Sequence, residues 1–425
     1  MDSRAIHSDK VSKELFTVVA PADALRRLQP LLVPIDRTES LAIEHARDRV
    51  VARDIFSRDE LPSFARSTID GYGVLAADTF SASAGSPAYL RLIGEVAMGT
   101  AATQAIERGC AIRVHSGAML PPGADAVVII ENSNQRGEEI EVLAPVAAGD
   151  DVLYPGEDVR VGDIVVQCGT RLRAAELGAL SAVGVTSIGL FERPRVAIIS
   201  SGDEVVAPDR FPGVGQVRDV NASALAALID SAGAIAVHYG IVPDDGAELL
   251  ARARAALADA DMLVISAGSS VSTRDMTAGV IAQLGLPGVL VRGVALKPGK
   301  PTILAMCAGK PVIVLPGNPL SVLIIAWRFV VPVVRALGGE SRDLSSFEDR
   351  TRTVARLAQT IPSRAGREDY VPVKLERGPD GSLLATPIFG KSSLTFTLVR
   401  ADGVAIVPVD RSELAAGTSA DVIRI

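Results

Sequence analysis

Between residues 195 and 321, four short apolar runs alternate with segments whose apolar residues recur at helical spacing. The apolar runs predict buried strands at Arg195 to Ile199, Ile235 to Ile241, Met262 to Ile265 and Val312 to Leu315. The spaced segments predict helices at Ala222 to Ser231, Ala247 to Ala258, Met276 to Leu284 and Leu320 to Leu337. Alternating strands and helices indicate parallel βαβ units with helices on both faces. The sequence therefore predicts a central, open, mostly parallel α/β sheet.

A polar loop rich in Gly, Asp, Ser or Asn follows each predicted strand. The loops are Ser200 to Glu204, Pro243 to Asp245, Ser266 to Asp275 and Pro316 to Pro319. Ligands of open α/β sheets bind beyond the carboxyl ends of the strands, so these loops are expected at one site. Another segment, Leu296 to Pro301, adds two lysines separated by Pro and Gly.

These residue types favour phosphate chemistry. Glycines let the backbone approach an oxyanion closely, and N–H groups at a helix start attract negative charge. Lysines add point charges to such a pocket. Carboxylates fit the same site when Mg²⁺ bridges them to substrate phosphates. No Ser-His-Asp set is evident, because the histidines are dispersed, and His238 in its apolar run is predicted to be a core residue.

The rest of the chain is predicted to form three further domains. Residues 20–70 and 149–190 are expected to pair as one elongated linker domain around an inserted, mostly-β domain at 71–148, where short alternating runs are separated by Gly and Pro turns. The sheet domain is placed at 191–339, and a C-terminal β-barrel-like domain at 340–425. Spacing within the first segment also predicts a helix from Glu39 to Val50.

Charge and apolar content argue against several classes of protein. The formal charge is -7 with a pI near 5.3, and Lys and Arg are scattered, so no nucleic-acid footprint is predicted. The longest apolar segment, Leu320 to Val334, is interrupted by Arg328 and Pro332 and is shorter than the ~18 residues that a membrane span needs. No apolar secretory segment is evident at the N-terminus. The cysteines are far apart, form no metal-ligand pair and are predicted to be buried, so a cytoplasmic protein is expected.

Six segments carry a resemblance to a known family: Phe64 to Val74, Ile112 to Val128, Gly156 to Asp158, Ser201 to Glu204, Lys297 to Pro301 and Leu315 to Pro319. In this order they resemble the MoeA family of molybdopterin molybdenumtransferases, which is similar to the C-terminal enzyme domain of gephyrin. The match covers nearly the whole chain and includes the last β domain around Ser392 and Asp402.

The resemblance implies a homodimer of elongated four-domain subunits with the active site between subunits. It implies insertion of molybdate into adenylylated molybdopterin, with release of AMP and assistance from Mg²⁺, in molybdenum cofactor biosynthesis. A molybdopterin adenylyltransferase would then supply the substrate, and molybdoenzymes would receive the product.

Motif matches and loop chemistry together assign candidate roles. The catalytic candidates are Asp70, Ser116, Asp158 and Glu204, and the candidate Mg²⁺ ligands are Glu204 and Asp244. Which acid binds metal and which takes protons is left open. The expected substrate contacts are Asp203, Asp244, Gly268, Ser269, Asp275, Lys297, Lys300, Pro316, Gly317, Asn318 and Pro319.

Structural roles are the alternative for the same residues. Asp70 precedes Gly71 and is also a good turn residue. Ser116 and Glu204 are also suited to capping backbone groups, and the two lysines to an exposed surface. Two alternative functions also stay open: a nucleotidyl transfer like that of molybdopterin adenylyltransferase, and a non-catalytic molybdopterin-binding or scaffold paralogue.

The chain also departs from the family pattern at some positions. Ser116 stands where the family usually has Thr, which keeps the hydroxyl. The segment Gly268 to Asp275 replaces a run with more glycines, so an altered backbone is expected at Ser269 or Thr273. The sequence does not decide between molybdate and tungstate.

Overall fold

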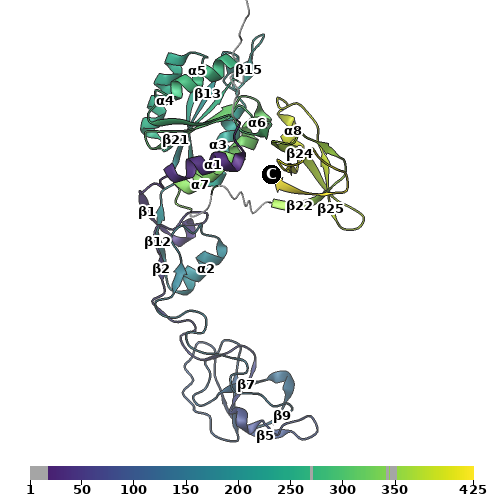
Figure 1. Ribbon diagram of the computed structural model, residues 1–425. Coiled ribbons are helices and arrows are strands. Elements are labelled where there is room, and N and C mark those ends of the chain that lie inside the picture. The colour runs from purple at the N-terminus through teal and green to yellow at the C-terminus, as the bar shows by residue number, and fades with distance from the viewer. Residues whose placement is uncertain (1–17, 269–270, 341–343, 345–351) are drawn as a thin grey trace, which may run out of the picture.

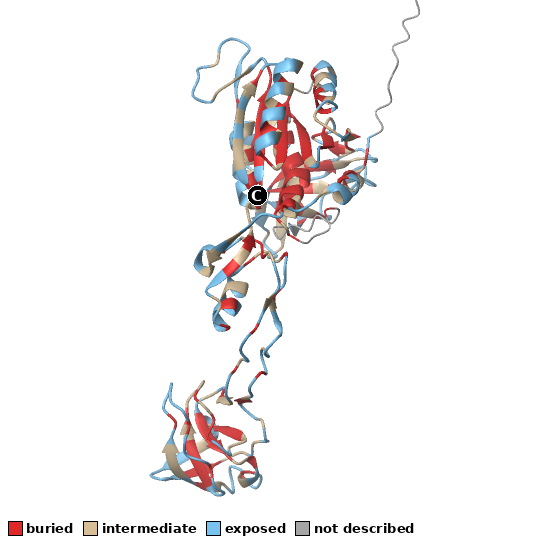
Figure 2. Ribbon diagram, turned by 90° about the vertical axis from the view of Figure 1, so that its left-hand side faces the viewer, coloured by how far each residue is buried: buried red, intermediate tan, exposed pale blue. Residues whose placement is uncertain are grey.

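The computed structural model is an elongated molecule, described for residues 18–268, 271–340, 344 and 352–425 (Figure 1). An α/β sheet domain and a β-barrel lie side by side at one end, and a second β domain lies at the other. A narrow stalk of paired chain segments joins the two ends (Figure 2). The predicted architecture, which combines an α/β sheet, a linker, an inserted β domain and a barrel-like domain, is confirmed, whereas the exact domain limits stay a prediction.

The α/β domain contains a six-stranded sheet in the order β16-β13-β17-β21-β20-β18. Strands β16, β13, β17 and β21 are parallel, as predicted, whereas β20 and β18 extend the sheet antiparallel and were not predicted. The strands are β13 (Arg195–Ser201), β16 (Ile235–Val242), β17 (Met262–Ala267), β18 (Pro287–Arg292), β20 (Ile303–Cys307) and β21 (Lys310–Pro316).

Helices cover both faces of this sheet. Because side chains alternate along a strand, Val196 and Ile198 pack on one face, and Ala197 and Ile199 on the other. The first face is covered by α1 (Pro21–Leu28), α3 (Asn221–Ala232), α6 (Pro319–Ile325) and α7 (Val331–Leu337). The second is covered by α4 (Gly246–Asp259) and α5 (Val271–Ile281). Of the predicted helices, α5 differs most, because it begins earlier than Met276.

The apolar segment after Leu320 forms the predicted helix, and Arg328 and Pro332 within the segment do not end it. Helix α6, a π-helical turn at Ala326–Val330 and α7 form one continuous helix of 19 residues, Pro319–Leu337. Pro332 lies two residues after the end of the π-turn, and a π-turn is a usual way for a helix to accommodate an irregularity. The helix is long and apolar enough to cross a membrane, but most of it is buried inside the sheet domain, so it is a core helix.

The stalk is formed by short antiparallel ribbons between segments far apart in sequence. Strand β1 (Thr38–Ala42) pairs with β12 (Ser187–Phe191), β2 (Ile55–Phe56) with β11 (Ile164–Val166), and β3 (Arg66–Ser67) with β10 (Val152–Leu153). Helix α2 (Ala174–Ala182) packs beside the ribbons.

The helix predicted from Glu39 to Val50 is therefore wrong. This segment forms β1 and a 3₁₀ turn at Ile43–His45, because the backbone of β1 is hydrogen bonded in register with β12. Two other local predictions are also wrong. His238 is exposed because β16 is an edge strand, and Cys168 is exposed, whereas Cys110 and Cys307 are buried.

The inserted domain is a six-stranded sheet in the order β7-β4-β6-β5-β9-β8. Its strands are β4 (Gly71–Val74), β5 (Ala88–Glu95), β6 (Cys110–Val114), β7 (Ala126–Ile129), β8 (Ser133–Arg136) and β9 (Glu139–Val142). Two apolar clusters, one on each side of this sheet, form its core.

The C-terminal domain is a closed five-stranded barrel. Its strands are β22 (Arg352–Leu357), β24 (Glu368–Arg377), β25 (Leu383–Pro387), β26 (Gly403–Val407) and β28 (Ser419–Arg424). A two-residue strand from the sheet domain, β19 (Leu296–Lys297), pairs in parallel with β24. Backbone pairing therefore joins the lysine-rich loop of the sheet domain to the barrel.

Packing of the long helix generates the first prediction. Phe329 is fully buried in the core of the sheet domain, so Phe329→Ala should lower the free energy of unfolding of this domain by about 3–5 kcal/mol. Urea titration followed by the fluorescence of Trp327, the single tryptophan, reports on this domain alone. Phe211 is 93% exposed, so Phe211→Ala should change the same free energy by no more than about 0.5 kcal/mol. Equal losses in the two variants would contradict the packing.

Candidate active site

The polar loops of the sheet domain meet at one edge of the sheet, as the βαβ pattern predicts. Strands β13, β16, β17 and β21 are parallel, so their carboxyl ends share that edge. The antiparallel strands reach it as well, because Ile303 at the start of β20 pairs with Val314 near the end of β21 and with Arg292 at the end of β18. The loop from Gly293 to Thr302 therefore joins the others there.

Two aspartates from different loops lie together at this edge. Ser201 Oγ donates to Asp244 Oδ1 at 3.0 Å, and the Asp244 N–H donates to Asp203 Oδ1 at 3.0 Å. Thr273 Oγ1 donates to Asp244 Oδ2 at 3.3 Å. Thr273 lies inside α5 and has no positive φ, whereas Ser269 lies outside the described residues, so the altered backbone expected at one of these two residues stays a prediction.

The other predicted residues of the edge have varied surroundings. The Glu204 side chain turns back toward Gly202, since a Cβ added to Gly202 would lie 2.7 Å from Glu204 Oε2. Asp275 forms an ion pair with Arg292. Gly317 packs close to the end of β17, because a Cβ there would lie 3.2 Å from the Ala267 carbonyl oxygen and close to Gly268. This close approach explains the glycine after Pro316.

The described residues contain no group of three or more Asp, Glu, His or Cys side chains placed to share a metal ion. Asp203 and Asp244, with the Ser201 hydroxyl, offer two carboxylates at this edge, and the exposed residue Glu204 directly follows Asp203 in the chain. Mg²⁺ commonly takes one or two carboxylates and completes its shell with water and substrate phosphates. These residues therefore fit Mg²⁺ that arrives with a phosphorylated substrate, rather than a resident ion.

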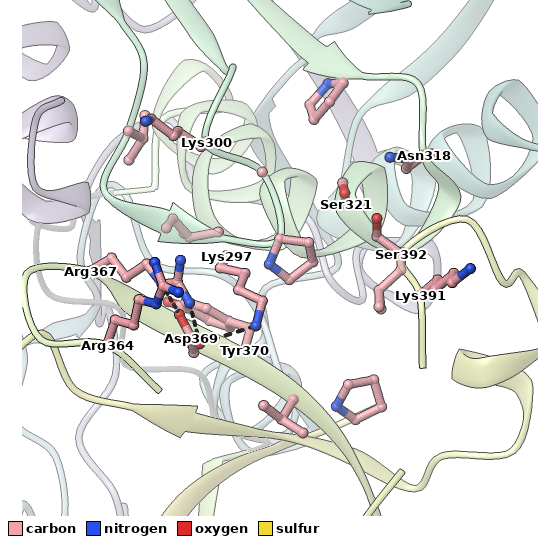
Figure 3. Close-up of a pocket in the computed structure, with 18 of the residues that line it drawn as sticks. Lys297, Lys300, Asn318, Ser321, Arg364, Arg367, Asp369, Tyr370, Lys391 and Ser392 are labelled. Carbon is pink, nitrogen blue, oxygen red and sulfur yellow. Dashed lines mark hydrogen bonds and ion pairs between the residues drawn. The ribbon is translucent and has the colours of Figure 1, made fainter. Parts of the chain in front are cut away.

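A cavity of about 810 Å³ lies between the sheet domain and the barrel (Figure 3). Lys297 and Lys300 line it from the sheet domain, together with Pro316 and Asn318 and with Ser321 on α6. The C-terminal domain contributes three more cations, from Arg364, Arg367 and Lys391, and the hydroxyl of Ser392. The Leu320 N–H donates to the Ser392 carbonyl at 3.2 Å, which ties the two walls together. The cavity is thus suited to a ligand with several negative charges.

A buried carboxylate positions two of these cations. Asp369 is 2% exposed and accepts hydrogen bonds from Arg367 Nε at 2.7 Å and Nη2 at 3.2 Å. Lys297 Nζ lies 3.7 Å from the same carboxylate, because Lys297 and Asp369 are register partners in the β19–β24 pair. Figure 3 shows Lys297, Arg364 and Arg367 gathered around Asp369.

The other catalytic candidates lie far from this cavity within one chain. Asp70 and Ser116 are in the inserted domain, and Asp158 is in a turn of the stalk, toward the opposite end from β21 (Figure 1). Asp70 Oδ1 accepts from the Ser116 N–H at 3.1 Å, and Ser116 Oγ donates to the Thr68 carbonyl at 2.9 Å. The structure therefore brings Asp70 and Ser116 together but separates them from Glu204 and Lys297.

His115 is a polar neighbour of Asp70 that the sequence analysis did not select. Its Nε2 lies 2.7 Å from Glu95 Oε1, and its Nδ1 lies 3.4 Å from Asp70 Oδ1. The hydrogen bond with Glu95, with a smaller contribution from Asp70, raises the pKa of His115 above its ordinary value of 6.5. His115 directly precedes Ser116 in a segment that matches the family, and this position could have identified it as a candidate.

Arg364, Arg367 and Lys391 were also missed in the sequence. The segment Arg364-Ala365-Gly366-Arg367 has the same arrangement as Lys297-Pro298-Gly299-Lys300, with two cations around a glycine. This similarity was a usable signal for the two arginines. The sequence around Lys391 and Ser321 gave no comparable signal.

Comparisons with known proteins cover almost the whole chain. Residues 19–184 match the MoeA N-terminal region (domain I and II), 197–336 a probable molybdopterin binding domain, and 354–425 the MoeA C-terminal region (domain IV). The chain is 33% identical to a molybdopterin molybdenumtransferase from Nostoc over 82% of this chain and 80% of that protein. It is 29% identical to the molybdopterin molybdenumtransferase of Bacillus subtilis over 91% of this chain and 90% of that protein.

A solved structure agrees with these sequence matches. The molybdopterin biosynthesis MoeA protein from Pyrococcus horikoshii superposes with a TM-score of 0.80 at 27% identity, covering 96% of this chain and all of that one. The three regions match in the same order, and the relatives align over most of their own length. The chain therefore belongs to the MoeA family.

Proposed function

We propose that this chain inserts molybdate into adenylylated molybdopterin and releases AMP, giving molybdenum cofactor. The observation that carries the proposal is the cavity of about 810 Å³ that both domains line with cations. Molybdate and the adenylylated pterin are both anions, so their binding in one place needs several fixed positive charges. The cavity volume lies within the range of about 300–1,000 Å³ that is typical of small-molecule sites.

Charged and uncharged side chains of the cavity would have different roles. Lys297, Arg364, Arg367 and Lys391 would hold the oxyanion, and the Ser321 and Ser392 hydroxyls would orient it by hydrogen bonds. Cleavage of the phosphoanhydride by water leaves one phosphate on the pterin and releases the other as AMP. When bound through Asp244 and Glu204, Mg²⁺ would supply neutralisation of the charge that develops on the departing phosphate.

We also propose a homodimer, because the candidate catalytic residues lie far apart within one chain. Asp70, Ser116 and Asp158 are far from the cavity of their own chain, whereas the length of the stalk would let an inserted domain reach a second copy. A twofold dimer would then contain two equivalent sites, each built from both subunits. We further propose a cytoplasmic location, a molybdopterin adenylyltransferase as the source of substrate, and molybdoenzymes as recipients.

Molybdate-dependent AMP release tests the function directly. Purified protein with adenylylated molybdopterin, Mg²⁺ and molybdate should release AMP, and Asp70→Ala or Glu204→Ala should lower the rate by about a hundredfold, or about 2.7 kcal/mol of barrier. Asp410→Ala, an exposed aspartate of the C-terminal domain, is the matched control and should leave the rate unchanged. Absence of AMP release by the unmodified protein with either molybdate or tungstate would refute the function and favour a binding or scaffold protein.

The cavity itself is tested through the KM for molybdate. Arg364→Gln and Lys391→Gln should each raise this KM about tenfold, or about 1.4 kcal/mol, because each removes one cation from the wall. Asp369 pairs with Arg367 and Lys297, which both variants keep, so the domain junction should be preserved. Arg411→Gln is the control, since Arg411 is an exposed residue of the same domain. An unchanged KM in both cavity variants would exclude this cavity as the oxyanion site.

Mixed dimers test whether the site is shared between subunits. Co-expression of Asp70→Ala and Glu204→Ala chains should restore about a quarter of the unmodified activity, because about half of randomly formed dimers are mixed and each has one intact site. If Asp70 and Glu204 acted within the same subunit, no mixed dimer would contain an intact site. Activity no higher than that of the separate variants would therefore contradict a shared site.

A further inference from the structure

A second, smaller cavity of about 290 Å³ adjoins the first. Lys300 and Pro301 line both cavities, so the two share a wall. The remaining lining of the smaller cavity includes Arg274, Arg292 and Ile303. Figure 3 shows the Lys300 side chain apart from the cluster of Lys297, Arg364 and Arg367, which fits its position between the cavities.

The cations of the smaller cavity come from three elements that meet at the ligand edge of the sheet. Arg274 lies near the start of α5, Arg292 ends β18, and Lys300 lies in the loop before β20. Arg292 is the register partner of Ile303, which places it at the same edge as Asp203 and Asp244. Asp275 forms an ion pair with Arg292 and so holds its guanidinium at the cavity.

Chemistry and size both point to a phosphate group. Guanidinium groups match phosphate oxygens with paired hydrogen bonds, and Lys300 adds a point charge. Ile303 and Pro301 give the cavity an apolar wall, and a lower local dielectric strengthens attraction between opposite charges. The volume lies at the lower limit of small-molecule sites, so it suits one phosphoryl group better than a whole nucleotide.

We infer that the smaller cavity binds a phosphate group of the adenylylated pterin, while the larger cavity binds the oxyanion. This assignment rests on the proposed function. Lys300, in the common wall, then contacts both anions and offsets the repulsion between them. Two separate anion sites explain why cations gather in two cavities on either side of Lys300 and Pro301.

The test separates the two KM values of the AMP-release reaction. Arg274→Gln and Arg292→Gln should raise the KM for adenylylated molybdopterin about tenfold and leave the KM for molybdate unchanged, whereas Lys300→Gln should raise both. Arg274→Lys keeps the charge and should recover part of the loss, which a purely structural defect would not show. Arg47→Gln, an 80% exposed arginine in the stalk, is the control. Equal effects on both KM values in the arginine variants, or no effect on either, would overturn the assignment.

Direct binding keeps this test independent of the proposed activity. Isothermal titration of the unmodified protein with inorganic pyrophosphate and with AMP should show binding, weakened about tenfold in Arg274→Gln for at least one of them. Weakened AMP binding would assign the cavity to the nucleotide phosphate. Weakened pyrophosphate binding with unchanged AMP binding would assign it to the pterin phosphate. If both anions bind Arg274→Gln and Arg292→Gln as tightly as the unmodified protein, the smaller cavity is not a phosphate site, even if AMP release is observed. If the variants lose anion binding but the unmodified protein releases no AMP, the phosphate site is retained and only the proposed reaction is rejected.

Discussion

The buried carboxylate of Asp369 is the contact on which the larger cavity depends. A carboxylate that is 2% exposed needs charged or hydrogen-bonding partners, because burial of an unpaired charge is very costly. Arg367 comes from the same barrel and Lys297 from the sheet domain, so Asp369 has both cations beside it only when the two domains are docked. The backbone pairing of β19 with β24 fixes the same junction. One buried charge thereby couples the packing of two domains to the placement of the cations between them.

The parallel sheet supplies the rigid support for the remaining groups. Its central strands β13, β17 and β21 are buried on both faces, so their side chains are used for packing and the chemistry is left to the loops at one edge. Gly317 lets the loop after β21 approach the end of β17, and the Ser201, Asp203 and Asp244 contacts hold two other loops together. The stalk, in contrast, consists of short two-stranded ribbons, and it places the inserted domain far from the sheet. This geometry suits a site completed by a second subunit.

Local charge in this protein differs from its net charge. The chain carries a formal charge of -7, yet cations from five segments line the two adjacent cavities. Net charge describes long-range interaction with partners such as nucleic acids, whereas a ligand inside a cavity responds to the nearest groups, because salt screens charges farther than about 8–10 Å. An acidic protein can therefore bind anionic substrates when folding brings some of its lysines and arginines together.

The sequence by itself determined the elements whose signals are local. The apolar runs predicted β13, β16, β17 and β21, and the glycine, lysine and acid content of the following loops predicted anion chemistry at their carboxyl ends. Only the tertiary structure decided the rest. Residues 38–42 became a strand because β12, far along the chain, hydrogen bonds with them. Arg364, Arg367 and Lys391 became part of a site because the barrel docks on β19, and His115 became a neighbour of Asp70 because β6 pairs with β4. Periodicity and turn residues report on neighbours along the chain, whereas these contacts join residues distant in sequence, whose pairing depends on the free energy of the whole fold.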